Sequence, residues 1–536
     1  MMEIALAFAL SFPIGLILLL VFWRRKETKH PPWLEEDIPF ISNTYQYLTD
    51  MGKFLERATK ALNKSNIIQF RLGAKLVCLV SGEKNTQVLF GPPHIVDPNM
   101  FHVLLMDTHW GMPRDEIKKF ENDKSGRQRV PLPGTEATSP RQRHWFNHHQ
   151  IYAEYLSSAK YTGVLADIFL RFFSEKLDQQ SASEWTTVQI YSLLRTDMAE
   201  SAIKSMFGSR ILELNPDLVK CYWQFDEVAG VLVWGLPKFL KPKPRHIRER
   251  LHDMVHKQVE DAWENFDWNG PEAQSDWDPY WGSRFAREIA RWLRESGFSN
   301  RTCSGHTTAT LFGLNGNTLP ISAWILMELI QDPPLLRAIN DEVMQVFTID
   351  QQTGKHHIDV HKLLLLPRLL SVYTEVLRMH ISFNVTREVR ESITIDGYHI
   401  SKGSLLQSAS QIAHYDEAVW ATDKHGATEF WAERHLEFAA GVDGNVPRPQ
   451  FSIKARPTSF FPFGGGYALC PGRHFAKREI MMAVAIIVAK FDIEFMGWVQ
   501  SDGSRSDRPA FNDQKYAGAA AVPPDRDMKI RWRRAW

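Results

Sequence analysis

The chain is poor in cysteine. Its four cysteines in 536 residues, Cys78, Cys221, Cys303 and Cys470, stand far apart and form no CxxC pair. This spacing excludes a disulfide scaffold and a zinc ribbon, and it fits a reducing compartment. An excess of one charge is also lacking, because 63 Lys and Arg residues balance 62 Asp and Glu residues. Proteins that bind nucleic acids usually carry a basic excess or a basic face, so nucleic acid is not an expected partner.

The globular part lacks long Ser/Gly/Pro linkers, repeats and low-complexity blocks. Hydrophobic residues make up 44% and charged residues 23% of the chain, as in ordinary globular proteins. Helical periodicity dominates, for example over Val164–Leu177 and Arg368–Met379, and strand-like alternation is confined to short patches such as Ile67–Phe70 and Ile393–Ile400. The pattern predicts one large, mainly α domain with small β-sheets over residues 46–536.

One long apolar run lies at the amino terminus, over Ile4–Trp23, and the basic residues Arg24–Lys26 follow it directly. A helix of about 20 apolar residues spans a bilayer. A cleaved signal is the alternative, but signals carry their basic residues in front and a small-residue cleavage site behind. We therefore expect residues 1–23 to be a transmembrane anchor and residues 24–45 a basic, proline-containing hinge. The positive-inside rule then places the remaining domain in the cytosol.

A glycine-rich loop, Phe463-Gly-Gly-Gly466-Tyr-Ala-Leu-Cys470-Pro-Gly472, precedes an apolar helical pattern over Arg473–Val488. Consecutive glycines allow positive φ and close backbone approach. A thiol at a helix N-terminus feels positive partial charge, which stabilises a thiolate, and a thiolate is a soft ligand suited to iron. A buried cysteine acting as a small hydrophobe is the alternative. A phosphate-binding loop is disfavoured, because no Gly-Lys-Ser/Thr follows the glycines.

The pattern F-x-x-G-x-x-x-C-x-G at Phe463, Gly466, Cys470 and Gly472 resembles the haem-binding loop of cytochrome P450 monooxygenases. Glu375-Val-Leu-Arg378 resembles the E-x-x-R helix of that family, and Phe430–Arg434 resembles its meander motif. The resemblance is clear over roughly residues 300–536. It implies a single haem-thiolate domain that binds haem b, with Cys470 as the axial iron ligand. Phe463, Gly464, Gly466 and Gly472 would shape the loop around the haem.

The resemblance also implies roles for residues outside the loop. Glu375, Arg378 and Arg434 would form a buried network that supports the cysteine loop from behind, although an exposed ion pair is the ordinary alternative. Arg387 is a candidate donor to a haem propionate, or else a solvated strand arginine. Two departures leave the propionate ligands open, since the chain has Ala468 and His149 where the family commonly has basic anchors.

The segment Asn317-Thr318-Leu-Pro320 occupies the place of the helix that crosses the oxygen-binding face in the family, where most members have an acid before threonine. Pro320 has no amide hydrogen for the carbonyl of Gly316, which leaves a free acceptor. We interpret Thr318 and Asn317 as the catalytic pair that delivers protons. A threonine hydroxyl bonded back to its own helix is the alternative.

The resemblance implies a monooxygenase that inserts one atom of O2 into an apolar substrate. Electrons would come from NADPH through a membrane-bound NADPH-cytochrome P450 reductase, with Arg473, Lys477 and Arg478 as a docking face or simply a solvated one. Asn-Thr-x-Pro and Ala521–Asp527 resemble the branch of sterol hydroxylases and prostacyclin synthase, so we expect a sterol-, terpenoid- or polyketide-like substrate. A reductase-independent isomerase of the prostacyclin-synthase kind is the alternative.

The anchor agrees with microsomal members of the family and predicts a single-pass protein of the endoplasmic reticulum membrane. The apolar segment Val228–Trp234 precedes Lys238, Lys241, Lys243 and Arg245. It is either a second contact with membrane lipid or a buried part of the core.

Overall fold

The computed structural model describes residues 29–39, 41–180, 183–233, 241–352, 356–439, 448–453 and 458–536. The predicted anchor and its basic flank lie outside these ranges. Within them, no helix combines the length and the apolar character that crossing a membrane requires. Part of the predicted hinge contacts the globule, because Trp33 forms a parallel bridge with Gln69 and Leu34 is buried.

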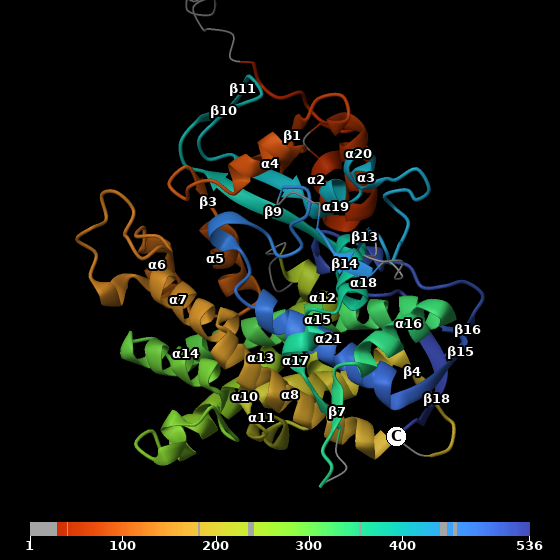
Figure 1. Ribbon diagram of the computed structural model, residues 1–536. Helices are drawn as coiled ribbons and strands as arrows, with labels where there is room; N and C mark the ends of the chain where they lie inside the picture. Colours follow the sequence, from red (N-terminus) through yellow and green to blue (C-terminus); the bar gives the residue numbers. More distant parts are fainter. Residues whose placement is uncertain are drawn as a thin grey trace, which may run out of the picture.

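Helices are the main secondary structure of the described residues, and the predicted mainly α fold with small sheets is confirmed (Figure 1). The longer helices are α3 (Met51–Leu62), α7 (His144–Ser157), α8 (Ala159–Gln180), α12 (Leu218–Leu232), α13 (Pro242–Asn265), α14 (Arg284–Glu295), α15 (Asn300–Gln331), α16 (Pro333–Met344), α18 (Pro367–His380) and α21 (Arg473–Lys490). Shorter ones include α4 (Glu83–Leu89), α5 (Asn99–Thr108), α6 (Arg114–Asn122), α10 (Ala199–Phe207), α17 (Val360–Leu363) and the π-helical turn η2 (Leu194–Met198). The first residues of the apolar segment 228–234 belong to α12, whose Ala229 and Leu232 are buried.

The largest sheet has six strands and lies at one end of the molecule (Figure 1). Its order is β1 (Ile67–Leu72), β2 (Lys75–Val80), β12 (Leu405–Ala409), β9 (Ile381–Val389) and β17 (Ala519–Ala521), and β3 (Val96–Asp97) also pairs with β9. The β2–β12 pair is parallel and the other pairs are antiparallel. β9 and β17 therefore bring the end of α18 and the C-terminal segment to the same place.

A second, antiparallel sheet has the order β16 (Arg505–Ser506), β15 (Phe491–Val499), β18 (Asp527–Arg534) and β4 (Thr186–Gln189). The predicted alternation over Ile393–Ile400 is a hairpin of β10 (Ile393–Ile395) and β11 (Tyr398–Ile400). β9 and β15 are longer than the short patches that the sequence pattern indicated.

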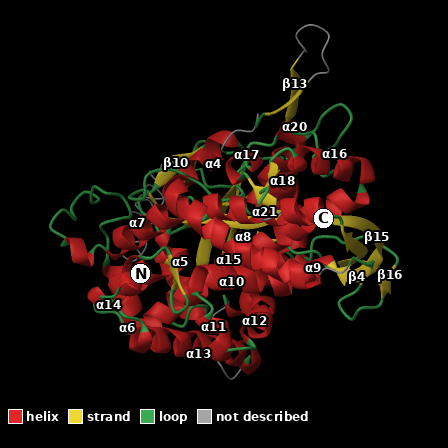
Figure 2. Ribbon diagram, turned by 60° about the horizontal axis from the view of Figure 1, so that its bottom comes forward, coloured by secondary structure: helices red, strands yellow, loops and turns green. Residues whose placement is uncertain are grey.

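Two apolar helices, α15 and α21, cross the middle of the molecule (Figure 2) and pack against each other. α15 carries no Asp, Glu, Lys or Arg between Thr302 and Met327, and nearly all of α21 from Glu479 onward is buried. A helix that is apolar on all sides belongs inside a protein. α15 begins at a proper cap, since the Ser299 hydroxyl accepts a hydrogen bond from the amide of Thr302. The helix continues through Pro320.

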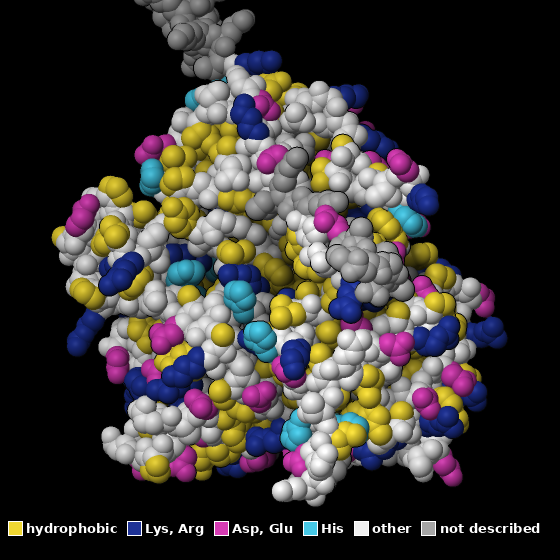
Figure 3. Space-filling model, in the orientation of Figure 1, with side chains coloured by type: hydrophobic (Ala, Val, Ile, Leu, Met, Phe, Trp, Pro, Cys, Tyr) yellow, Lys and Arg dark blue, Asp and Glu magenta, His cyan; other side chains and the backbone are white. Residues whose placement is uncertain are grey.

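The surface carries mixed charge. On the face drawn in Figure 3, Lys and Arg side chains are interspersed with Asp and Glu side chains. This distribution agrees with the balanced composition of the sequence.

Candidate functional site

The loop before α21 is held in a fixed shape by its backbone. The amide of Cys470 donates a 3.0 Å hydrogen bond to the carbonyl of Phe463, which closes the loop on itself. Gly464 and Gly466 have φ values of 74° and 61°, in the left-handed region. A Cβ on Gly466 would also lie 2.6 Å from the carbonyl oxygen of Phe90, so the loop backbone passes directly over the end of α4. These two glycines are required by the loop's path.

Cys470 differs from the other cysteines in exposure and in its neighbours. It is partly exposed, whereas the other three are buried. Burial raises the pKa of the Cys470 thiol, but the amides of Gly472 and Arg473 and the charge of Arg473 lower it. Burial alone raises the pKa of Cys78 and Cys303 to about 12. Only Cys470 therefore combines access with amide donors that favour a thiolate.

Glu375, Arg378 and Arg434 lie together in a buried network behind the loop. Arg378 donates to both carboxyl oxygens of Glu375 at 2.8 Å, and Arg434 donates to Oε1 at 2.8 Å. Burial would raise the pKa of Glu375, but the hydrogen bonds and charges of the two arginines lower it to about 2. Arg378 also binds the carbonyls of His414 and Ala427. The network thus fixes α18 to the segment that leads into the cysteine loop.

Arg387 of β9 lies against the inner side of the loop. Its guanidinium donates to the carbonyls of Leu89 at 3.1 Å, Thr386 at 2.9 Å and Gly465 at 3.3 Å. The side chain is buried, and burial lowers its pKa to about 10. A buried cation without a carboxylate hydrogen-bonded to it favours an anion nearby.

Arg127 is a second cation at this place, and the sequence pattern did not single it out. Its guanidinium lies 5.0 Å from the centre of the Trp145 ring and 3.3 Å from Nδ1 of His102. Burial lowers the pKa of Arg127 to about 10, with Asp97 raising it and Arg387 lowering it. Arg387 and Arg127 are two positive charges that repel each other in one region of the protein, and such a pair favours an anion between them.

Ala468 and His149, where the sequence departs from the pattern of the family that it resembles, contribute less than the two arginines to the binding of an anion. Ala468 offers no side-chain donor. His149 is half-buried, and burial together with the charge of Arg127 lowers its pKa. The indole of Trp145 donates a 2.8 Å hydrogen bond to the carbonyl of Phe120. The arginine that stacks on Trp145 thus comes from a loop rather than from α7.

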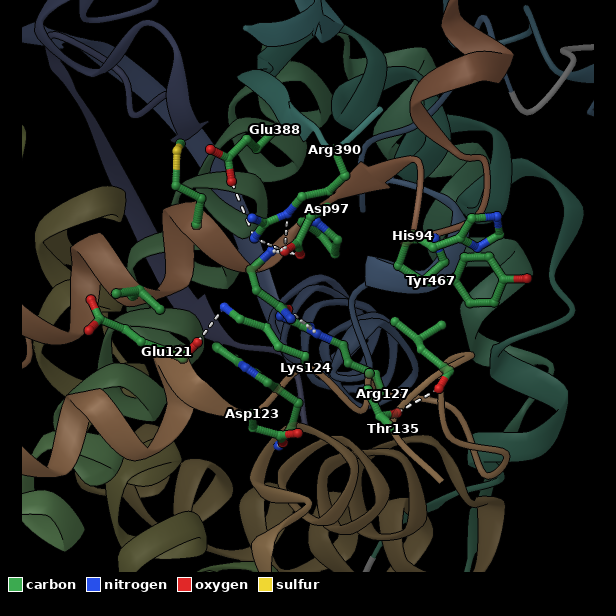
Figure 4. A pocket seen from close by; sticks show the side chains of 18 of the residues that line it. His94, Asp97, Glu121, Asp123, Lys124, Arg127, Thr135, Glu388, Arg390 and Tyr467 are labelled. Atoms are coloured by element: carbon green, nitrogen blue, oxygen red, sulfur yellow. Dashed lines mark hydrogen bonds and ion pairs between the residues drawn. The ribbon is translucent and has the colours of Figure 1, made fainter. Parts of the chain in front are cut away.

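A groove of about 580 Å³ opens beside this pair, with Tyr467 of the cysteine loop on one side (Figure 4). Arg127 is one of its lining residues. Arg390, another lining residue, donates a 3.1 Å hydrogen bond to Asp97 and lies 3.2 Å from Glu388. Arg127, Lys124 and Lys402 of this wall form no ion pair within 4.0 Å among the described residues, but the two lysines are exposed whereas Arg127 is half-buried.

Asn317 lies on the accessible face of α15. Its Oδ1 accepts a 3.3 Å hydrogen bond from the amide of Ala521 in β17, and its Nδ2 donates 3.4 Å to the carbonyl of Gly313. Gly313 is exposed in the middle of this otherwise buried helix, and a Cβ there would have nothing within 4 Å. Asn317 and Gly313 therefore border open space inside the molecule.

Thr318, the next residue of α15, lies on a buried face of the helix. It is 2% exposed, and its hydroxyl donates back to the carbonyl of Leu314. This is the arrangement in which a helical threonine bonds its own backbone. Pro320 supplies no amide hydrogen to the carbonyl of Gly316, as the sequence indicated. Asn317 and Thr318 are consecutive residues, about 100° apart around the helix axis, so Asn317 lies on the accessible face of α15 and Thr318 on a buried face.

Glu479 of α21 is a further buried acid that the sequence analysis missed. It is 0% exposed, and neither carboxyl oxygen has a hydrogen-bond partner of good geometry among the described residues. Burial raises its pKa well above the usual range, and the neighbouring Thr318 hydroxyl offsets part of this rise. A lone acid at the start of an apolar helical run is the signal that marks it in the sequence.

The three basic residues after the ligand are half-buried and hold neighbouring elements. Arg473 donates 2.8 Å to the carbonyl of Cys470, Lys477 donates 3.3 Å to the carbonyl of Leu364, and Arg478 donates 3.3 Å to the hydroxyl of Thr162. Each also keeps part of its surface accessible.

Comparison with known proteins adds to this geometry. The family model described as Cytochrome P450 matches residues 69–506. Cytochrome P450 monooxygenase calL from Penicillium decumbens is 44% identical over 531 residues, which cover 99% of this chain and 98% of that protein. Cytochrome P450 monooxygenase fsoE from Humicola fuscoatra is 25% identical and covers 95% of this chain and 88% of its own length. Cholesterol 7-alpha-monooxygenase from Cricetulus griseus is 24% identical and covers 67% of this chain and 68% of its own length.

Proposed function

Because the chain belongs to the cytochrome P450 monooxygenase family, we propose that it inserts one atom of O2 into an apolar substrate, with electrons from NADPH. The observation that carries this proposal is Cys470, the one accessible cysteine, held at the start of α21 beside two amide donors. The matched relatives are named as monooxygenases, and nothing in the site favours an isomerase over them.

The residues present fit haem b. Cys470 would hold the iron as a thiolate, because a thiol that coordinates a metal ion gives up its proton even where burial favours the neutral form. Arg387 and Arg127 offer two cations for the haem carboxylates; Asp97 stabilises the charge of both, but neither arginine is hydrogen-bonded to a carboxylate among the described residues. When bound, the haem supplies the oxygen chemistry, for which thiolate ligation favours cleavage of the O–O bond. Phe463, Gly464 and Gly466 hold the loop that presents the ligand.

Residues on two faces of α15 can hold a proton or orient a water molecule. Asn317 presents an amide to the open space on the accessible face. Burial raises the pKa of Glu479 well above its usual range, and the carboxyl lies beside the Thr318 hydroxyl. We infer that Asn317 orients water on the accessible side, and that Thr318 and Glu479 hold the proton reserve on the other.

Membrane attachment belongs to the same proposal. Residues 1–23 would anchor the protein in the endoplasmic reticulum membrane, with the catalytic domain in the cytosol; the uncharged run and its basic flank support this. An apolar substrate would reach the site from membrane lipid. A membrane-bound NADPH-cytochrome P450 reductase would dock near Arg473, Lys477 and Arg478, which follow the ligand on α21 and remain partly accessible.

The proposed substrate class is a sterol-, terpenoid- or polyketide-like compound. The likeness to a cholesterol 7-alpha-monooxygenase and the Asn-Thr-x-Pro segment support it. The test is turnover of candidate substrates by the protein with NADPH and a reductase in isotopically labelled O2. We expect the label in the product and no product without the reductase. Product formed at the full rate without reductase would contradict the proposal.

A further inference from the structure

Asp226 and Tyr222, one turn apart on α12, approach the accessible face of α15 at Gly316. A Cβ on Gly316 would lie 3.1 Å from the Tyr222 hydroxyl and 3.3 Å from Oδ1 of Asp226. Tyr222 is 0% exposed and Asp226 is 8% exposed. Glycine at this position therefore lets two buried polar groups come within contact distance of the helix.

The cluster has unused hydrogen-bonding capacity. The Tyr222 hydroxyl has no hydrogen-bond partner among the described residues. The carbonyl of Gly316 receives no amide hydrogen from Pro320. A buried polar group without a partner is destabilising, so such a group in a folded protein calls for an explanation. Here an unpaired hydroxyl and a carboxyl lie against the same glycine.

Asp226 is held in place by neighbours from two other elements. The Tyr516 hydroxyl, in the turn η6 (Gln514–Tyr516), bonds to it, and the positive charge of Arg195 in η2 lies near. Arg195 itself is engaged elsewhere, 3.6 Å from Glu227 and 4.5 Å from the centre of the Trp223 ring. Burial raises the pKa of Asp226 to about 7. The carboxyl can thus accept or donate a hydrogen bond near neutrality.

The surroundings of this cluster are aromatic. The centre of the Trp110 ring lies 5.7 Å from the centre of the Phe312 ring on α15 and 6.5 Å from that of Phe225 on α12. Phe312 also touches the position above Gly316, with its ring 3.6 Å from the Cβ that would stand there. Asn317, which borders the open space of the candidate site, is the next residue after Gly316. The polar cluster is therefore set into an aromatic wall beside that space.

We propose that Asp226 and Tyr222 form a binding subsite for a hydroxyl group of the substrate. The preferred substrate is then an apolar polycycle that already carries an alcohol, held by the Tyr222 hydroxyl and the Asp226 carboxyl while its hydrocarbon body lies on the aromatic wall. This inference rests on the proposed function and deepens it. It also gives the order of reactions, because an enzyme that installs or exposes this alcohol must act first.

Optical titration with adamantane and adamantanol tests the subsite, scored by the spectral change on displacement of water from the haem iron. The wild-type protein should bind the alcohol more tightly than the hydrocarbon. Asp226→Ala and the near-isosteric Tyr222→Phe should weaken adamantanol binding about tenfold, as for an unpaired buried hydrogen bond, and change adamantane binding less than about twofold. Asp217→Ala, an exposed residue just before the same helix, is the matched control and should change neither.

An equal preference for adamantanol in wild type, Asp226→Ala and Tyr222→Phe would overturn the subsite. So would the absence of any response of the wild-type protein to adamantanol, or an equal loss of affinity for both compounds in the two variants. Equilibrium dialysis against adamantanol gives the same ratio without the haem spectrum. The carbon monoxide spectrum of the same samples shows separately whether thiolate ligation, and with it the proposed function, is intact.

Discussion

Arg434 and Glu375 are joined by a 2.8 Å hydrogen bond from Nε to Oε1, although 59 residues separate them in the sequence. Arg434 also donates to the carbonyls of Gly426 at 3.0 Å and Glu429 at 2.8 Å. The carboxylate of Glu375 therefore organises the irregular segment before the cysteine loop, which has few regular backbone hydrogen bonds of its own. Loss of the Glu375 charge would therefore destabilise the whole segment before the cysteine loop and not only the Arg434 side chain.

Removal of the Glu375 charge tests this role. Glu375→Gln leaves two buried arginines without their carboxylate, and we expect it to lower the free energy of unfolding by about 3–5 kcal/mol. The control is Glu433→Gln, because Glu433 and Arg368 form a part-exposed pair at 3.5 Å, worth about 1 kcal/mol or less. Urea unfolding followed by tryptophan fluorescence measures both. Similar losses in the two variants would contradict the account.

Replacement of Arg127 tests the cationic pair. Arg127→Gln removes one proposed partner of the haem carboxylates, so we expect haem to transfer to an apoglobin acceptor about tenfold faster, with a smaller change in Arg127→Lys. Lys124→Gln, an exposed residue of the same groove, should leave the rate unchanged. An unaltered rate in Arg127→Gln would show that the pair does not hold the haem.

Substitutions on the accessible and on the buried face of α15 test the proposed proton route. Asn317→Asp should keep coupling, since a carboxylate still accepts the amide of Ala521, whereas Asn317→Leu loses the acceptor and should divert NADPH consumption into hydrogen peroxide. Thr318→Ala and Glu479→Gln should also lower product per NADPH, because each alters the proton reserve. The measurement is product and peroxide formed per NADPH. Full coupling in Thr318→Ala would restrict Thr318 to its helical hydrogen bond.

Buried neutral histidines predict a loss of stability in acid. His306 is 2% exposed, and burial lowers its pKa to about 4 from an ordinary value of 6.5. Between these values the unfolded chain binds the proton and the folded protein does not, so stability falls as pH drops from 6.5 to 4, by roughly 3 kcal/mol for this one group.

His306→Phe should flatten part of that dependence, because the aromatic neighbours Phe120 and Trp292 accept a ring and the Nε2 of His306 has no partner among the described residues to lose. Chemical unfolding at several pH values measures it. The same slope in wild type and His306→Phe would show that the histidine is already protonated or solvated.

The sequence predicted those helices and turns that short-range interactions along the chain determine. The periodicity over Arg368–Met379 falls within α18, and the strand-like alternation over Ile393–Ile400 falls on the hairpin of β10 and β11. The E-x-x-R spacing places Glu375 and Arg378 on one face of α18. The longer strands β9 and β15 were not predicted, because their pairing partners lie far away in the sequence and supply the stabilisation that short-range patterns do not show.

The residues that the sequence did not reveal depend on long-range packing. Arg127 sits in an irregular loop and meets Trp145 only in the folded protein. Asp226 appears on an ordinary amphipathic helix, and its burial follows from the approach of α15 and the turn that carries Tyr516. The accessibility of Asn317 and the burial of Thr318 likewise depend on which side of α15 packs against α21. The spacing of residues along α15 does not reveal which side is buried.

The central claim, that Cys470 is the thiolate ligand of a haem iron, is tested most directly by the reduced carbon monoxide spectrum. The wild-type protein should show the red-shifted Soret band that a thiolate ligand produces. Cys470→Ser should lose that band, while Cys78→Ser, Cys221→Ser and Cys303→Ser should keep it. A red-shifted band that persists in Cys470→Ser would contradict the account.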